Sequence, residues 1–159
     1  MSTALQIKKG FTLIELLVVI GILAVLLAIV LIAINPARQF SQANNTKRRS
    51  DVNAILNAIH QYGADNKGNL APLSIPQQSP STAGAQIGGA TVNICTFLVT
   101  RYLAALPVDP LTNNGTPVTS CSANASYVTN YRVTQSTSDN RLTVEAPAAE
   151  LGDTISVTR

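Results

Sequence analysis

The stretch KKGFTLIEL, residues 8–16, stands at the start of a long apolar segment and decides the fold of the N-terminal part of the chain. Two lysines and a glycine precede Phe11, and the chain from Leu16 to Ile34 carries no charged side chain. An apolar run of roughly 20 residues is the length that a helix needs to cross a membrane. The pattern therefore predicts a transmembrane helix, with Glu15 as its one carboxylate. A carboxylate in such a segment is costly and usually marks a functional site.

A secretory signal peptide and a plain membrane anchor are the two simpler interpretations of residues 1–34. A signal peptide has a shorter apolar region of roughly 7–15 residues, followed by a cleavage site of the A-x-A type. The apolar region here is longer, and no such site stands before the chain turns polar at Asn35. A plain anchor fits the length of the segment but gives Glu15 no role.

The ordered motif at residues 8–16 resembles the class III leader junction of type IV prepilins and type II secretion pseudopilins. In that family a membrane aspartyl peptidase cuts between the glycine and the phenylalanine and methylates the new amino terminus. The resemblance therefore implies cleavage within this motif and N-methylation of the residue after the cut. The residues so implicated are the cleavage pair Gly10 and Phe11, the basic leader residues Lys8 and Lys9, and the assembly residue Glu15.

The same resemblance implies a structural role, not an enzymatic one, and a set of partners. It implies a single-pass protein of the cytoplasmic membrane that is processed by prepilin peptidase. An assembly platform and its ATPase would then polymerise it into a helical homo-oligomeric filament at the cell surface. A pseudopilin of a type II secretion or competence (DNA-uptake) system is the alternative within the family. A membrane-tethered binding ectodomain that does not assemble is the alternative from another class.

A second helical pattern follows the apolar segment. Proline disfavours helical geometry at the residue before it, so Pro36 predicts a kink or short unwound stretch around Ala33–Pro36. Gly63 is the expected end of the second helix. Apolar residues recur first at Ala37, Phe40 and Ala43, and then at Val52, Ile55, Leu56, Ile59 and Tyr62. The second set has the spacing of an amphipathic helix.

The chain as a whole predicts an α+β fold of the pilin type. A long N-terminal helix, first transmembrane and then amphipathic, is expected to pack on a small antiparallel β-sheet. The expected boundaries are a cleaved leader at residues 1–10, an apolar transmembrane and assembly helix at 11–35, an amphipathic helix at 36–62 and a globular head at 63–159.

The expected head begins with a long loop at residues 63–91, which is rich in glycine, proline, serine, glutamine and asparagine. Cys95–Leu106 is then predicted as a short helix, with a strand at Val92–Thr100 as the alternative. Three later segments are predicted as antiparallel strands because of their alternating or β-rich composition. They are Tyr127–Gln135, Leu142–Ala146 and Thr154–Thr158.

The pentapeptide LPVDP, Leu106–Pro110, resembles the turn that follows a short helix in major pseudopilins and many pilins. Those proteins often continue with an aromatic residue and a glycine, whereas LTNNG follows here at residues 111–115. Some pseudopilins bind calcium in the loops beyond this turn. The acidic residues after Asp109 are scattered without EF-hand-like spacing, so no metal and no cofactor are expected.

Lys47-Arg48-Arg49, in the second helix, has two interpretations. A solvated helix face is the general expectation for such a run, and a DNA-binding surface is the sharper alternative. The formal net charge is only +3 and falls by two when Lys8 and Lys9 leave with the leader, which gives little support to a nucleic-acid partner. His60 is the only histidine, so no metal cluster and no catalytic residues are expected.

Cys95 and Cys121 are the only cysteines, and both follow the apolar segment. They flank the Leu106–Pro110 turn. Two free thiols are the simpler interpretation, because unpaired cysteines are common core residues. However, when the only two cysteines of a chain both lie in a domain outside the cytoplasm, a disulfide between them is favoured. We expect that bond.

Processing at the motif gives a direct test. We expect the mature chain to begin at Phe11, and we expect Gly10→Val to block cleavage, because the side chain hinders access of the peptidase to the backbone. Membrane insertion should be unchanged in that variant, since the apolar segment is intact. N-terminal sequencing and intact mass measure both properties. Ala4→Ser, a conservative change elsewhere in the leader, is the control. Assembled protein that begins at Met1 or beyond Ile34 would contradict the expectation.

Overall fold

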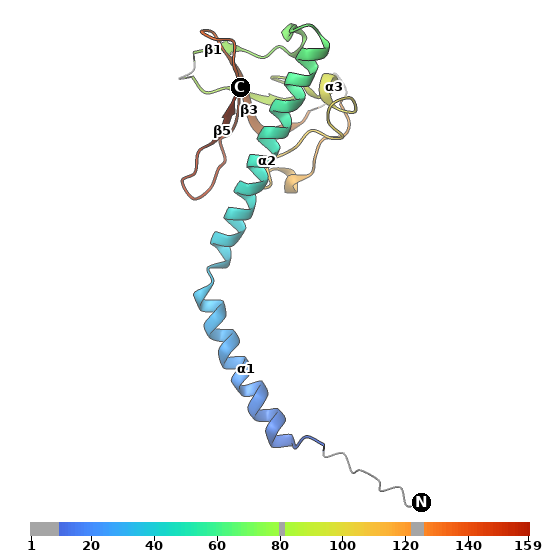
Figure 1. Ribbon diagram of the computed structural model, residues 1–159. Coiled ribbons are helices and arrows are strands. Elements are labelled where there is room, and N and C mark those ends of the chain that lie inside the picture. The colour runs from blue at the N-terminus through green and yellow to red at the C-terminus, as the bar shows by residue number, and fades with distance from the viewer. Residues whose placement is uncertain (1–9, 80–81, 122–125) are drawn as a thin grey trace, which may run out of the picture. The chain divides into compact units, whose positions relative to one another are not determined.

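The computed structural model describes residues 10–79, 82–121 and 126–159 (Figure 1). The basic leader residues Lys8 and Lys9 lie outside the described residues. The chain divides into two compact units, an N-terminal unit, Met1–Gln39, and a C-terminal unit, Phe40–Arg159.

Helix α1, Leu13–Ala33, is the one helix in the described part of the chain that is long and apolar enough to cross a membrane. None of its residues is buried. Its C-cap residue, Ile34, has extended backbone geometry, and α2 begins at Pro36. The Asn35 side chain accepts a hydrogen bond from the Arg38 amide at 3.2 Å and so caps the new helix. The predicted short unwound stretch is therefore confirmed.

Helix α2, Pro36–Asp65, buries the stripe that its second apolar pattern predicts. The side chains concerned are Val52, Ile55, Leu56, Ile59 and Tyr62, all of them buried. The first apolar set does not form a core face, because Ala37, Phe40 and Ala43 are exposed. Polar Asn45 and Arg48 hold the buried positions in that part of the helix instead.

Gly63 does not end α2, as the sequence had indicated, but lies buried inside it. A Cβ at this position would lie 3.2 Å from Leu70 Cδ2, so the absence of a side chain allows the following segment to pack close to the helix. The helix closes two residues later, at Asp65. Gly68, with φ +83°, donates its amide to the Gly63 carbonyl at 2.7 Å.

The segment predicted as a loop at residues 63–91 is more structured than its composition indicates. It contains a 3₁₀ helix, η1 (Ala71–Leu73), and two short strands, β1 (Gln77–Gln78) and β2 (Ala85–Gly88). Leu73 and Ile87 are fully buried. The prediction of an unpacked loop is wrong here, because both strands gain hydrogen bonds from a distant strand, β3.

Helix α3 covers only Cys95–Leu98, so the predicted helix to Leu106 is too long. Val99 turns to extended geometry and Thr100 has φ +73°, which ends the helical run. The alternative prediction of a strand over Val92–Thr100 is also wrong. A further 3₁₀ turn, η2, covers Asn113–Gly115.

In the described part of the chain, five strands form one mixed sheet around β3, Val128–Ser136. β4 (Leu142–Ala146) pairs antiparallel with β3, and β5 (Ile155–Thr158) pairs antiparallel with β4. These are the three predicted strands, and they are confirmed. β2 is antiparallel to β3, whereas β1 runs parallel to it, a pairing that the sequence did not predict.

The core of the C-terminal unit forms where the apolar stripe of α2 packs on the sheet (Figure 1). Tyr131 and Val133 of β3 and Val144 of β4 are fully buried in this core, because alternate residues of a strand point to one face. The predicted α+β class is therefore confirmed.

Cys95 and Cys121 form the expected disulfide, with their Cα atoms 5.3 Å apart. The bond joins segments separated by 26 residues and lying on either side of the Leu106–Pro110 turn. It fixes the start of α3, where Cys95 is fully buried.

Loss of this disulfide should destabilise the C-terminal unit. We expect Cys95→Ser/Cys121→Ser to lower the free energy of unfolding by roughly 3 kcal/mol, because the closed loop restricts the unfolded chain. Urea unfolding of the detergent-solubilised full chain measures this, and a reductant should destabilise the natural chain but not the double variant. Two thiols that react with an alkylating agent in native protein without reductant would rule out the bond.

Candidate functional site

The start of α1 brings together the residues of the predicted processing and assembly motif. Gly10 is exposed and has open space around it, and the Phe11 side chain is 88% exposed. Thr12 is the N-cap of the helix, with extended backbone geometry. The backbone at the expected cut site is therefore outside the helix and accessible.

Glu15 is bound by Thr12 in a capping box. The Glu15 Oε2 atom accepts hydrogen bonds from the Thr12 amide at 2.8 Å and from the Thr12 hydroxyl at 2.7 Å. In return, the Glu15 amide donates to the Thr12 hydroxyl oxygen at 3.3 Å. This arrangement satisfies orphan donors at the helix start and places a negative charge at the positive end of the helix dipole.

The role of Thr12 is one that the sequence analysis missed. The signal was present, because a threonine followed three residues later by a glutamate, just before an apolar run, is the sequence pattern of a capping box. Glu15 is thus not an isolated carboxylate, since one residue of its own turn supplies two donors to it.

Helix α1 has no polar face. Its side chains from Leu16 to Ala33 are uncharged, and large apolar residues are exposed all around it, Val30 least at 49% and Ile32 most at 87%. Such a surface requires lipid or other apolar helices around it, because a helix that is apolar on all sides is normally buried.

A second group of charged residues lies in the C-terminal unit and centres on Arg48. Arg48 Nε donates to Asp109 Oδ2 at 2.7 Å and Arg48 Nη2 donates to Asp109 Oδ1 at 3.2 Å, a bidentate pair. Both side chains are 0% exposed. Arg48 Nη1 also donates to Glu150 Oε2 at 2.7 Å and to Asn45 Oδ1 at 2.9 Å.

This cluster joins three parts of the C-terminal unit. Arg48 and Asn45 come from α2, Asp109 from the LPVDP turn, and Glu150 from the connection between β4 and β5. Asn45 strengthens the junction, since its Nδ2 donates to the Glu150 carbonyl at 2.8 Å and its Oδ1 accepts from the Glu150 amide at 3.0 Å. The β4–β5 connection and the LPVDP turn are thereby both fixed to α2.

The pKa values follow from these contacts. Burial acts to lower the pKa of Arg48, but the hydrogen bonds that it donates to Asp109 and Glu150 outweigh this effect, and the pKa is raised. The pKa of Glu150 is lowered by the hydrogen bonds from Arg48, Asn44 and Ser41. Arg48 and Glu150 are therefore both charged at neutral pH.

The basic run Lys47-Arg48-Arg49 is only in part the solvated face that the sequence indicated, since Lys47 and Arg49 are exposed but Arg48 is not. Arg48 is fully buried, and Arg49 forms an ion pair with Asp153 at 2.7 Å. Lys47 Nζ donates to the Gly115 carbonyl at 3.3 Å. Because the central residue of the run is inside the fold, the run also does not form a continuous basic surface for DNA.

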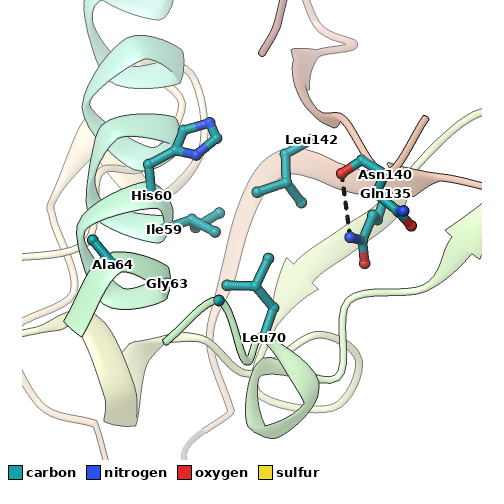
Figure 2. Close-up of a pocket in the computed structure, with 9 residues that line it drawn as sticks. Ile59, His60, Gly63, Ala64, Leu70, Gln135, Asn140 and Leu142 are labelled. Carbon is teal, nitrogen blue, oxygen red and sulfur yellow. Dashed lines mark hydrogen bonds between the residues drawn. The ribbon is translucent and has the colours of Figure 1, made fainter. Parts of the chain in front are cut away.

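No catalytic arrangement stands out among the described residues. A cavity of about 350 Å³ lies beside the C-terminal turns of α2. Figure 2 shows the residues that line it, which are Ile59, His60, Gly63, Ala64, Gly68, Leu70, Gln135, Asn140 and Leu142. The Gln135 side chain donates to the Asn140 carbonyl at 3.2 Å across its rim. His60 is exposed there, and no nucleophilic side chain is among the other residues that line the cavity. Within the described ranges, no group of three or more metal-binding side chains occurs.

Comparison with known proteins bears on the N-terminal segment. A family model described as the prokaryotic N-terminal methylation motif matches residues 6–31. The match includes Gly10, Phe11 and Glu15 and extends over most of α1. No curated protein and no solved structure matches the chain.

Replacement of the buried Arg48 should destabilise the C-terminal unit more than replacement of its exposed neighbour Arg49. We expect Arg48→Met to lower the free energy of unfolding by about 3–5 kcal/mol, because Asp109 is left buried without a cation. Arg49→Met should cost less than about 1 kcal/mol, because its ion pair is exposed. Urea unfolding of the detergent-solubilised chain compares the two variants.

A double variant tests the physical reason. Arg48→Met/Asp109→Asn removes both charges, so we expect it to lose less stability than the sum of the two single variants. Additive losses, or equal losses for Arg48→Met and Arg49→Met, would show that the buried charge pair is not the source of the effect.

Proposed function

We propose that this chain, whose methylation motif supports the type IV pilin and pseudopilin family, is a structural subunit of a helical filament and polymerises through α1. The observation that carries the proposal is the combination at α1 of that motif, a surface apolar on all sides, and one carboxylate at the helix start. The motif supports a pilin-like or pseudopilin precursor, and the filament is the further step.

Before assembly, α1 is the single membrane anchor. The prepilin-type leader implies processing by prepilin peptidase, for which we propose cleavage between Gly10 and Phe11 and N-methylation of Phe11. Residues 1–10 then leave as the leader. The disulfide of the C-terminal unit supports an oxidising compartment for that unit, outside the cytoplasm.

After assembly, α1 exchanges lipid for the α1 helices of other subunits. An assembly platform and its ATPase would extract the subunit from the cytoplasmic membrane and add it to a filament at the cell surface. Because α1 is apolar on every side, packing among identical helices can bury it without a change in its sequence pattern. The interior of the filament is then a low-dielectric environment in which an unpaired charge is costly.

Glu15 would neutralise a second charge in that environment. Cleavage creates an amine at Phe11, and N-methylation keeps its positive charge. Thr12 already orients the Glu15 carboxylate toward the N-terminal end of α1. A pair between Glu15 and a Phe11 amine, its own or a neighbour's, would leave neither charge uncompensated. Where the amine belongs to a neighbouring subunit, only one axial offset between the two subunits would bring the two charges together.

Two alternatives differ in what surrounds the subunit. A secretion or competence pseudopilin would use the same chemistry at Phe11 and Glu15 in a shorter fibre. This alternative is weakened at the Leu106–Pro110 turn, because LTNNG follows it instead of an aromatic residue and a glycine. A tethered ectodomain would use α1 only as an anchor and would not need Glu15.

Replacement of Glu15 separates assembly from anchoring. We expect Glu15→Leu to be cleaved after Gly10 and to stay in the membrane, but to yield about tenfold less filament or worse, because the Phe11 amine is left buried and unpaired. Glu15→Asp should be partly impaired, since its side chain is one methylene shorter. The measurement is the amount of subunit in sheared fibres relative to the amount in membranes, with the fibres seen by electron microscopy.

Ile14→Leu, beside Glu15 on the same helix, is the matched control and should assemble normally. A normal fibre yield from Glu15→Leu would contradict the proposed pairing and favour the tethered ectodomain.

A further inference from the structure

The C-terminal end of α2 carries an aromatic patch that the proposed function does not use. The rings of Phe97 and Tyr102 each meet the ring of Tyr62 edge to face, at centroid distances of 6.0 Å. Tyr62 is 8% exposed and forms the base, whereas Phe97 is 37% exposed. α3, which carries Phe97, lies beside this end of α2 (Figure 1). Three of the seven aromatic residues of the chain thus lie together.

An ion pair completes the aromatic patch, which we define as Tyr62, Asp65, Phe97, Arg101 and Tyr102. The Tyr102 hydroxyl donates to Asp65 Oδ2 at 2.8 Å, and Arg101 Nη2 donates to the same oxygen at 3.3 Å. Arg101 also lies over the Tyr102 ring, 5.3 Å from its centroid. The charged groups remain available, since the side chains of Arg101 and Asp65 are 69% and 49% exposed.

The backbone that presents Arg101 and Tyr102 is strained. Thr100 has φ +73°, a conformation that is rare for a β-branched residue. Its amide donates to the Leu103 carbonyl at 2.7 Å, which closes the turn. An exposed threonine in this geometry costs free energy, and the turn it permits places the next two side chains over Asp65 and Tyr62.

We propose that the aromatic patch binds a neutral oligosaccharide. A sugar ring has an apolar C–H face and a rim of hydroxyl groups. An exposed ring such as Phe97 offers a surface for the apolar face, while the free lone pairs of Asp65 and the free N–H groups of Arg101 bind hydroxyls. Tyr62 and Tyr102 pack in or against the core, and Phe97 rests on Tyr62 in the short helix that the Cys95 disulfide holds, so little ordering accompanies binding.

The charge of the patch disfavours nucleic acid. Strands of nucleic acid bind where several cations follow the phosphates, whereas Asp65 neutralises Arg101 here. The inference goes beyond the proposed filament and does not depend on it, because every group of the patch belongs to one copy of the C-terminal unit.

The test uses the full chain in detergent micelles, so that no assembly is required. Maltotriose and triacetylchitotriose are titrated separately at millimolar concentration, and saturation-transfer NMR reports contacts to the sugar protons. We expect transfer to the C–H protons of at least one of the two. Phe97→Leu, which keeps an apolar side chain but removes the ring, should weaken binding by about tenfold, the order found for stacking on one ring. Asp65→Asn should also weaken it.

Val128→Ala is the matched control, because Val128 is an exposed apolar residue outside the patch and should bind as the natural chain does. Unchanged thermal unfolding shows that each variant is folded. Absence of transfer to both sugars, or equal transfer in Phe97→Leu, would overturn the proposal. Binding of an oligo-dT strand that depends on Phe97, with no sugar binding, would overturn it in favour of nucleic acid.

Discussion

The arrangement of the C-terminal unit depends on the buried guanidinium of Arg48. A charge without solvent contact is tolerated only where carboxylates and amides surround it. Here these groups come from separate parts of the chain, with Asp109 in the turn after α3 and Glu150 between β4 and β5. A displaced turn or connection would leave Arg48 uncompensated. Since apolar residues in place of a buried ion pair are often as stabilising, we infer that the cluster contributes mainly to the uniqueness of this arrangement.

Glu15 and Arg48 are both charged groups in apolar surroundings, and they are stabilised by partners of different kinds. Arg48 is satisfied by residues distant in sequence, so its partners exist only in the folded unit. Glu15 is satisfied by Thr12, within its own helical turn. A local solution does not require a tertiary fold, and it therefore suits a helix that is surrounded by lipid. It also leaves Glu15 Oε1 with capacity for a further donor, which is the capacity that pairing with an amine would use.

Periodic features of the sequence predicted structure well, and features that depend on distant partners did not. The apolar run of α1, the stripe from Val52 to Tyr62 and the strands β3, β4 and β5 were predictable, because a uniform or repeating pattern marks what faces lipid or core. Arg48 was not, since a basic residue between two others has no local sign of burial. β1 and β2 are too short to show a period, and only pairing with β3 defines them. At the candidate site, Glu15 was found from its cost in an apolar segment, while Thr12 was missed although its spacing to Glu15 carries the capping signal.

Tyr62 links the core of the C-terminal unit to its surface. It is the last residue of the buried stripe of α2, and its ring also contacts Phe97 and Tyr102. Because protein interiors are closely packed, the position of the aromatic patch is set by the same helix face that forms the core. The residues proposed for assembly, Phe11 and Glu15, belong to the N-terminal unit, whereas the patch belongs to the C-terminal unit. The proposed recognition at the patch and the proposed assembly through α1 thus rest on separate residues, so that substitutions at one should leave the other unchanged.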